Sequence, residues 1–198
     1  MIQDYLCEYV IPHISYTFSY LKYLKINIFE IIPEKFRLIL FKVSILKSGR
    51  ANMCEGSIYS ETVVVTAAGC CQVVLRNRTS NFEIVAGELE PTITTDFGQR
   101  LKIKNYLIHP NYTRLSETND ICLIYLEGGF DLSGGNVSSI PLADKDPESG
   151  TDCTISGWRA VPTGNLKWAT VSTTRNENCQ NSNPELHICV GGEVSSNS

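Results

Sequence analysis

The sequence predicts an all-β fold whose first half closes into a small barrel. Short apolar segments rich in β-branched residues recur along the chain, and Gly, Pro and Asn turns separate them. Several segments alternate apolar and polar residues, which is the pattern of a half-buried strand. Eight cysteines in 198 residues add the expectation of a disulfide framework formed in an oxidising compartment.

The expected strands follow one another from residue 38. In the first of them, residues 38–46, Phe41, Val43 and Ile45 alternate on one face, and residues 47–50 form a turn. Val63 to Thr66 is a β-branched run that predicts a buried strand. The other expected strands are residues 53–59, 82–87, 101–108, 121–126, 152–158 and 166–173, and a helical turn is expected at 177–180. Such a series of short strands is typical of a closed barrel.

Residues 1–35 differ from the rest of the chain in lacking glycine. Aromatic residues at roughly helical spacing favour a helix over residues 15–29, and a poorly ordered leader is the equal alternative. Residues 1–21 carry Asp4 and Glu8 but no Lys or Arg, so no clear signal peptide is present. The longest uncharged run, residues 9–21, is too short and too polar to span a bilayer.

Composition excludes several classes of partner and cofactor. The net charge is -4 without a basic stripe, so we expect no nucleic-acid or membrane partner. His13, His109 and His187 show no metal-ligand spacing with the cysteines, so we expect no metal and no cofactor. Three N-glycosylation sequons begin at Asn77, Asn111 and Asn136.

Five short motifs share one family pattern. They are Cys54-Glu55-Gly56-Ser57-Ile58, V-V-V-T-A-A-G-C-C at 63–71, N-D-I-C-L-I at 119–124, D-C-T-I-S-G-W at 152–158 and I-C-V-G-G at 188–192. From near residue 36 onward the chain resembles the trypsin-like (chymotrypsin-fold) serine proteases. The resemblance implies a chymotrypsin-like double Greek-key β-barrel. It divides the chain into an atypical N-terminal extension (1–35) and a protease domain (36–198), with a first barrel (36–130) and a partial, truncated second barrel (131–198).

The resemblance also assigns roles in the chemistry of acyl transfer. That reaction uses a serine nucleophile, a histidine base, an aspartate that orients the histidine, and backbone N–H groups that bind the oxyanion. Asp120 matches the aspartate, Gly69 stands at the histidine position, and the G-D-S-G-G serine motif is absent before the last residue, Ser198. Because glycine supplies no base, we expect a proteolytically inactive homologue that is not an enzyme and acts as a binding module or decoy.

Three alternatives stay open. The sequence could be a truncated or incorrectly assembled version of a secreted serine-type endopeptidase, an active endopeptidase, or a disulfide-rich structural domain outside the family. For the inactive homologue, the expected partner is a protein or peptide ligand, and the homologue is expected to bind it as a monomer. Secretion to the extracellular space is expected from the family and from the cysteines.

Further pairings and sites follow from the resemblance alone. It implies the disulfides Cys54–Cys70, Cys71–Cys122 and Cys179–Cys189, leaves Cys153 free, and offers Cys7 no partner. Glu88 matches the first acid of the family's calcium loop, but Gly98 replaces the closing acid, so no strong Ca²⁺ site is expected. Glu55 replaces a glycine and is expected near the leaving-group side of the site.

Overall fold

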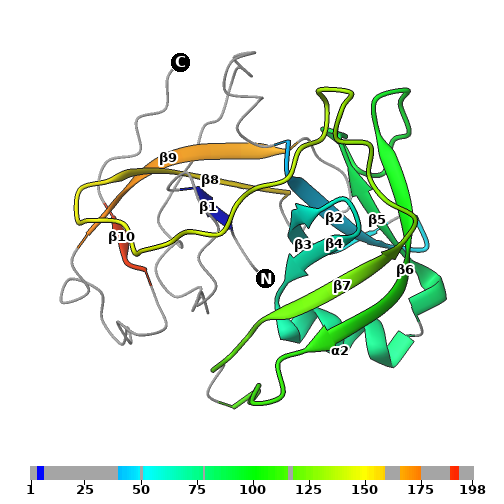
Figure 1. Cartoon of the computed structure of the whole chain (residues 1–198), viewed down its shortest axis with the longest axis horizontal. Helices are drawn as coiled ribbons and strands as arrows, with labels where there is room; N and C mark the ends of the chain where they lie inside the picture. The colour runs from blue at the N-terminus through cyan, green and yellow to red at the C-terminus, as the bar shows by residue number, and fades with distance from the viewer. Residues whose placement is uncertain are drawn as a thin grey trace.

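The strands of the protein form two units that lie next to one another. The computed structural model describes residues 4–6, 40–49, 51–77, 79–115, 118–158, 166–174 and 188–191. One unit is a closed barrel with the strand order β2-β3-β4-β7-β6-β5, and the other is a four-stranded sheet with the order β1-β8-β9-β10 (Figure 1). The all-β prediction is therefore confirmed.

The barrel is built from antiparallel neighbours throughout. Its strands are β2 (Lys42–Lys47), β3 (Ala51–Ser60), β4 (Val63–Thr66), β5 (Phe82–Ala86), β6 (Gln99–Ile108) and β7 (Cys122–Glu127). Pairing of β2 with β5 closes the sheet on itself, so no open strand edge remains in this unit.

Alternation of residue type along the strands decides which side chains fill the barrel. In β7, Cys122, Ile124 and Leu126 are buried while Leu123 and Tyr125 are half-buried on the outer face. The other strands contribute branched side chains to the same core, among them Val43, Ile45, Ile58, Val64 and Ile84, all fully buried. The barrel interior is thus packed with hydrophobic side chains.

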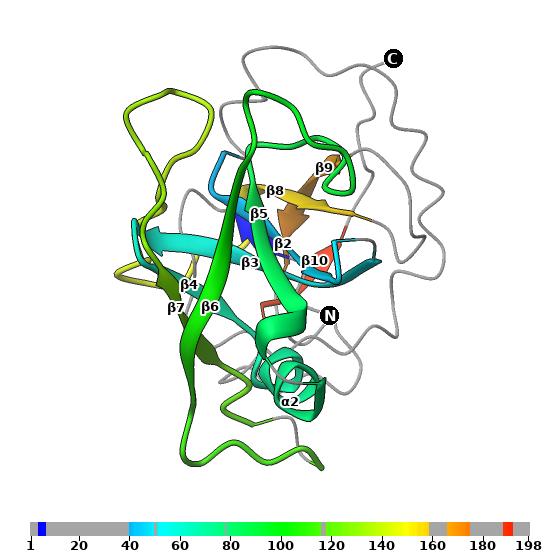
Figure 2. The same ribbon diagram turned by 90° about the vertical axis from the view of Figure 1, so that its right-hand side faces the viewer.

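A helix that the sequence analysis did not include follows β4. Helix α2 (Ala68–Asn77) and the 3₁₀ turn η3 (Thr79–Asn81) connect β4 to β5 at one end of the barrel (Figures 1 and 2). The carbonyl of Ala67 accepts hydrogen bonds from the N–H groups of Cys70 (3.1 Å) and Cys71 (3.2 Å), which sets the first turn. Val74 is buried in the barrel core and anchors the helix.

The second unit is an open sheet in the part of the chain that the structure describes. It contains β1 (Asp4–Leu6), β8 (Asp152–Gly157), β9 (Lys167–Thr173) and β10 (Val190–Gly191), and it lies behind the barrel in Figure 2. Strand β1, which the sequence analysis did not expect, pairs antiparallel with β8. The expected helix at 15–29 and turn at 177–180 lie outside the described residues.

A buried carboxylate, that of Glu55, links the two units. The ammonium group of Lys42 lies 3.1 Å from Oε2 of Glu55, and both side chains are almost fully buried. Oε1 of Glu55 accepts the backbone N–H of Trp158, at the end of β8, at 2.7 Å. Glu55 therefore connects the barrel to the second sheet. The expectation that Glu55 lies near the leaving-group side of the site stays a prediction.

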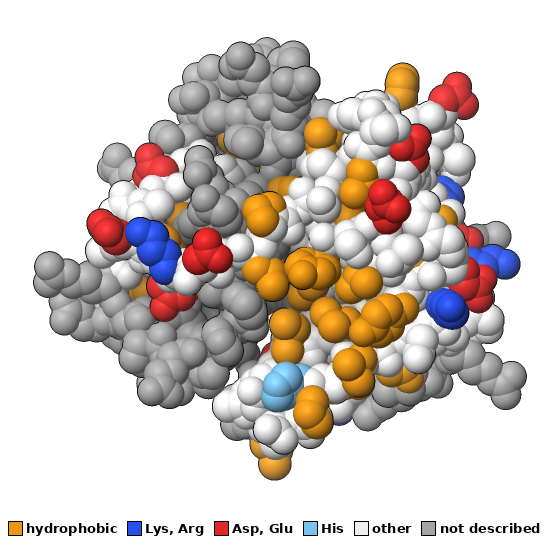
Figure 3. Space-filling model, in the orientation of Figure 1, with side chains coloured by type: hydrophobic (Ala, Val, Ile, Leu, Met, Phe, Trp, Pro, Cys, Tyr) orange, Lys and Arg blue, Asp and Glu red, His pale blue; other side chains and the backbone are white. Residues whose placement is uncertain are grey.

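An apolar band covers the outer face of the barrel. Val65 of β4, Leu123 of β7 and Leu107 of β6 stand in register across three strands, and Val63 pairs with Tyr125 beside them. Figure 3 shows hydrophobic side chains gathered over β4 and β7 on this face.

Candidate active site

The two segments expected to face one another at the site do so. Gly69 is the second residue of α2, and its backbone N–H donates a hydrogen bond to Oδ1 of Asp120 at 2.9 Å, across 51 residues of sequence. The first N–H groups of a helix have no partner inside the helix, and the helix N-terminus favours negative charge. The carboxylate of Asp120 satisfies one of those groups and is held in place by it.

Asp120 approaches α2 from the turn that leads into β7. Asn119 has a φ of 56°, a left-handed conformation that Asn tolerates better than most residues. Its side chain donates from Nδ2 to the carbonyl of Asn111 at 3.0 Å, and its own carbonyl accepts the N–H of Ile121 at 2.8 Å. These contacts fix the direction in which the Asp120 side chain leaves the backbone.

Residue 69 offers space beside the carboxylate. A Cβ atom at Gly69 would lie 3.5 Å from the hydroxyl oxygen of Tyr112 and 3.9 Å from Oδ1 of Asp120, which are ordinary van der Waals distances. Oδ2 of Asp120 makes no hydrogen bond within the described part of the chain. Residue 69 therefore has no side chain that could donate a hydrogen bond to the Asp120 carboxylate.

Tyr112 is the site residue that sequence reasoning missed. It lies in the turn His109-Pro110-Asn111-Tyr112, and its hydroxyl faces the position of residue 69. The ring nitrogen Nδ1 of His109 accepts the N–H of Asn111 at 3.2 Å, so this histidine closes the turn. His13 and His187 lie outside the described residues.

Two disulfides frame the site. The structure joins Cys54 to Cys70 and Cys71 to Cys122, over 16 and 51 residues of sequence. Cys70 and Cys71 directly follow Gly69, and Cys122 lies two residues after Asp120. The second bridge therefore ties together the two segments that meet at the site.

The expectation of a free Cys153 is wrong. Cys153 and Cys189 are both disulfide-bonded. All six described cysteines are thus in disulfides, which are typical of extracellular and other oxidising compartments. Cys7 and Cys179 lie outside the described residues, so the Cys179–Cys189 pairing stays a prediction.

The loop that corresponds to the family's calcium loop is closed by contacts to the side chain of Glu88. The buried carboxylate of Glu88 accepts the backbone N–H of Thr95 at 2.7 Å and its hydroxyl at 3.0 Å. Gly98 packs directly on the same carboxylate, and a Cβ there would collide with it. Among the described residues, no three His, Cys, Asp or Glu side chains converge as a metal site requires.

The three sequons differ in their surroundings. Asn77 is the last residue of α2, and its side chain lies outside the described part. Asn111 is exposed in the turn that carries Tyr112, while Asn136 is half-buried at the edge of the loop that contains Glu88.

The described residues contain no helix with the length and apolar character needed to cross a membrane.

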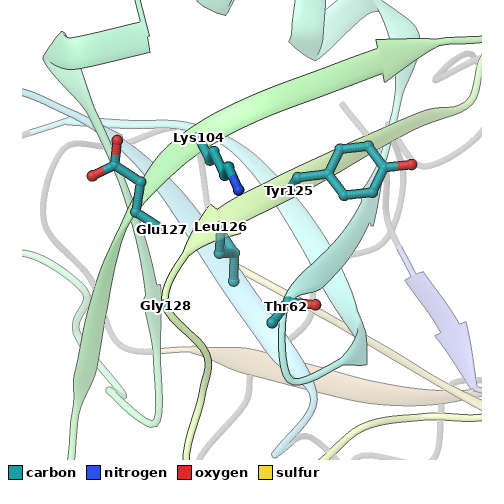
Figure 4. Close-up of a pocket in the computed structure, with 6 residues that line it drawn as sticks. All are labelled: Thr62, Lys104, Tyr125, Leu126, Glu127 and Gly128. Carbon is teal, nitrogen blue, oxygen red and sulfur yellow. The ribbon is translucent and has the colours of Figure 1, made fainter.

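Away from the Asp120 site, a hollow lies at the C-terminal end of β7. It has a volume of about 560 Å³ and is lined by Thr62, Lys104, Tyr125, Leu126, Glu127 and Gly128. In Figure 4 the Lys104 side chain points into this hollow while the Glu127 carboxylate points away. No acid–base pair converges there, so the Asp120 site is the better candidate for function.

Comparison with known proteins places these features in a family. Residues 37–198 match the family described as Trypsin. The curated relatives include trypsin delta of Drosophila erecta (30% identical over 148 residues), trypsin alpha of Drosophila melanogaster (29% over 148) and trypsin of Sarcophaga bullata (30% over 118). These alignments cover 72%, 72% and 60% of this chain, and 55%, 55% and 44% of the relatives. The chain thus spans about half the length of the curated relatives it matches.

Solved structures agree on the fold. Human heparin binding protein superposes with a TM-score of 0.67 at 23% identity, covering 84% of this chain and 71% of that one. A mutant of the same protein gives a TM-score of 0.64, also at 23% identity, over 79% and 68% of the two chains. At this identity the likeness establishes the chymotrypsin-like fold and nothing further.

These matches overturn one expectation. The inference that the chain is not an enzyme rested on Gly69 and on the missing serine motif, and it conflicts with a family of serine endopeptidases whose matched members are named trypsins. A missing side chain at one position describes chemistry at that position and does not measure activity. With its barrel, its Gly69–Asp120 contact and a family match over residues 37–198, the chain belongs to the trypsin-like serine protease family.

Proposed function

We propose that this protein is a secreted member of the serine endopeptidase family that binds polypeptide at the Asp120 site, through a basic side chain of the ligand. One observation carries the proposal: Asp120 is held by the N–H of Gly69 while residue 69 contributes no side chain to its carboxylate. The disulfides support the proposed extracellular location.

The chemistry of the site favours a cationic group. In Ser-His-Asp acyl transfer the aspartate accepts a hydrogen bond from the imidazole and stabilises its charged form. Here Oδ2 of Asp120 has no hydrogen-bond partner in the described residues, and the adjacent space accommodates at least a methyl group. A histidine, lysine or arginine side chain of a ligand would form a charge-assisted hydrogen bond at this point.

Binding of short capped peptides tests the proposal. We expect a peptide with a central histidine or lysine to bind more tightly than the same peptide with alanine, and D120N to remove that preference. The matched control is D144N, which changes the net charge equally at an exposed aspartate. Equal affinity for the basic and alanine peptides, or an unchanged preference in D120N, would refute the proposal.

A second candidate function, peptide-bond hydrolysis, is favoured by the trypsin relatives. Because the chain spans about half the length of those relatives, their activity is a proposal for this chain and needs a direct assay. Fluorogenic peptides with Lys or Arg before the scissile bond, tested with and without added imidazole, would reveal turnover. Gly69→His would place an imidazole beside Asp120, so hydrolysis that rises in this variant and falls again in G69H/D120N supports the second candidate.

A further inference from the structure

The loop from Gly87 to Phe97 meets a distant segment, Asn136 and Val137, at Gly87. This residue has a φ of 74°, in the left-handed region that glycine adopts at little cost. A Cβ atom there would lie 2.8 Å from the carbonyl oxygen of Phe97, 3.1 Å from Cγ2 of Val137 and 3.5 Å from the carbonyl oxygen of Asn136. The absence of a side chain at Gly87 therefore lets the loop that ends at Phe97 lie directly against Asn136.

The meeting point contains a hollow with an apolar wall. Its volume is about 410 Å³, within the range of roughly 300–1,000 Å³ that small-ligand sites occupy. Ile93 and Phe97 line it and remain 51% and 64% exposed. The carboxylate of Glu88, also in the lining, is already bonded by Thr95. The hollow thus offers apolar surface, and its buried acid is satisfied within the loop.

Asn136 belongs to the lining and begins the sequon Asn136-Val137-Ser138. Val137 is buried in the barrel core, and the N–H of Ser138 donates to the carbonyl of Leu40 at 3.2 Å. These two anchors fix the backbone on the C-terminal side of Asn136. The side-chain amide of Asn136 makes no hydrogen bond in the described structure, so a substituent on its nitrogen breaks none.

We propose that Asn136 carries an N-linked glycan whose first N-acetylglucosamine packs against Phe97 and Ile93. In the transfer, Nδ2 of Asn136 forms a bond to C1 of the sugar and loses one proton. The bond between C1 and the phosphate oxygen of a lipid diphosphate-linked oligosaccharide breaks, and the lipid diphosphate leaves. The disulfides are typical of proteins that pass through the oxidising compartment where this reaction occurs. Packing of the sugar then removes exposed apolar surface from water.

Asn111 provides the internal contrast. It also begins a sequon, but it is exposed in a turn and lines neither the hollow beside Phe97 nor the one beside Lys104. A glycan on Asn111 would extend into solvent. The two sites therefore differ in whether the first sugar has an apolar surface to contact.

The test compares two products of enzymatic deglycosylation, both made from one folded sample. The chain, with N77Q and N111Q, is secreted from cells restricted to high-mannose glycans, and glycopeptide mass spectrometry measures occupancy of Asn136. Endoglycosidase H then leaves one N-acetylglucosamine on the asparagine. Peptide-N-glycosidase F removes the whole glycan and leaves aspartate, for which N136D is the control. Because both products come from folded protein, a failure to fold without the glycan does not confuse the result.

We expect Asn136 to be occupied in most molecules. Binding of the apolar dye bis-ANS should stay low after endoglycosidase H and rise at least twofold after peptide-N-glycosidase F, with N136D matching the latter. F97S should abolish the difference in dye binding between the two deglycosylated products. An unoccupied Asn136 would overturn the proposed modification, and equal dye binding by the two products would overturn the packing of the sugar on the loop.

Discussion

The Lys42–Glu55 pair is predicted to be the most sensitive polar contact in the described structure. Both side chains are nearly fully buried, and Glu55 also accepts the N–H of Trp158. Replacing Glu55 by glutamine keeps an acceptor for Trp158 but removes the negative charge that lies 3.1 Å from the Lys42 ammonium. Breaking a buried pair in this way costs about 3–5 kcal/mol. Since whole domains are stable by only about 5–15 kcal/mol, this loss is large.

The same reasoning predicts recovery in a double variant. K42M removes the ammonium that lies beside the Glu55 carboxylate and should cost about as much as E55Q. K42M/E55Q removes both charges and keeps the acceptor for Trp158, so its stability should lie within about 1 kcal/mol of the wild type. The non-additivity of the three variants then measures the coupling between the two side chains.

Urea unfolding with intact disulfides, followed by tryptophan fluorescence, measures these differences. The control is E83Q, which removes one partner of the partly exposed Glu83–Arg100 pair and should cost less than about 1 kcal/mol. If E55Q loses no more stability than E83Q, or if the losses in K42M and E55Q simply add, the account of a buried, coupled link between the units is refuted.

Three other perturbations give independent tests. Alanine at Cys71 and Cys122 opens a 51-residue loop and should lower the free energy of unfolding by about 4 kcal/mol on the loop-entropy model, measured by urea unfolding; a loss below about 1 kcal/mol would contradict it. Gly69→Ala places a methyl group at ordinary contact distances within a helix and should stabilise the protein by about 0.5–1 kcal/mol, and destabilisation would show that the space is not available. The Ser133 hydroxyl, and then its N–H, lower the pKa of Asp131, so the stability that this carboxylate contributes is present above its ordinary pKa and is lost as the pH falls through its lowered value. NMR titration should show the pKa of Asp131 rising in S133A, and identical titration curves would refute the assignment.

Most of the barrel could be predicted from the sequence because its signals are local. β-branched runs and alternation located all six strands to within a few residues, and turn residues separated them. Helix α2 was missed because its segment carries two valines and a glycine, which favour helices poorly. Its first turn forms on the Ala67 carbonyl beside two disulfides, and those contacts override the local preference.

The contacts that sequence could not supply are those made at long range. Strand β1 has three residues, too few for any periodicity, and exists by pairing with β8 about 150 positions later. The prediction of a free Cys153 was wrong because it came from the family's pairing pattern and not from this chain's geometry. The contacts of Glu55 with Lys42 and Trp158 could not be predicted, because these residues are adjacent to it only in the folded protein.

The way in which Asp120 is held explains how a site can change one residue and keep its frame. The carboxylate is bonded to a backbone N–H of residue 69, which any residue except proline supplies. The Cys71–Cys122 bridge and the left-handed Asn119 fix the same segments without reference to the side chain at 69. The position of the aspartate and the identity of its neighbour are therefore set by different contacts. Fold and family follow from the first, whereas function depends on what occupies the space beside Asp120, and that is the quantity which peptide binding and the Gly69→His variant measure directly.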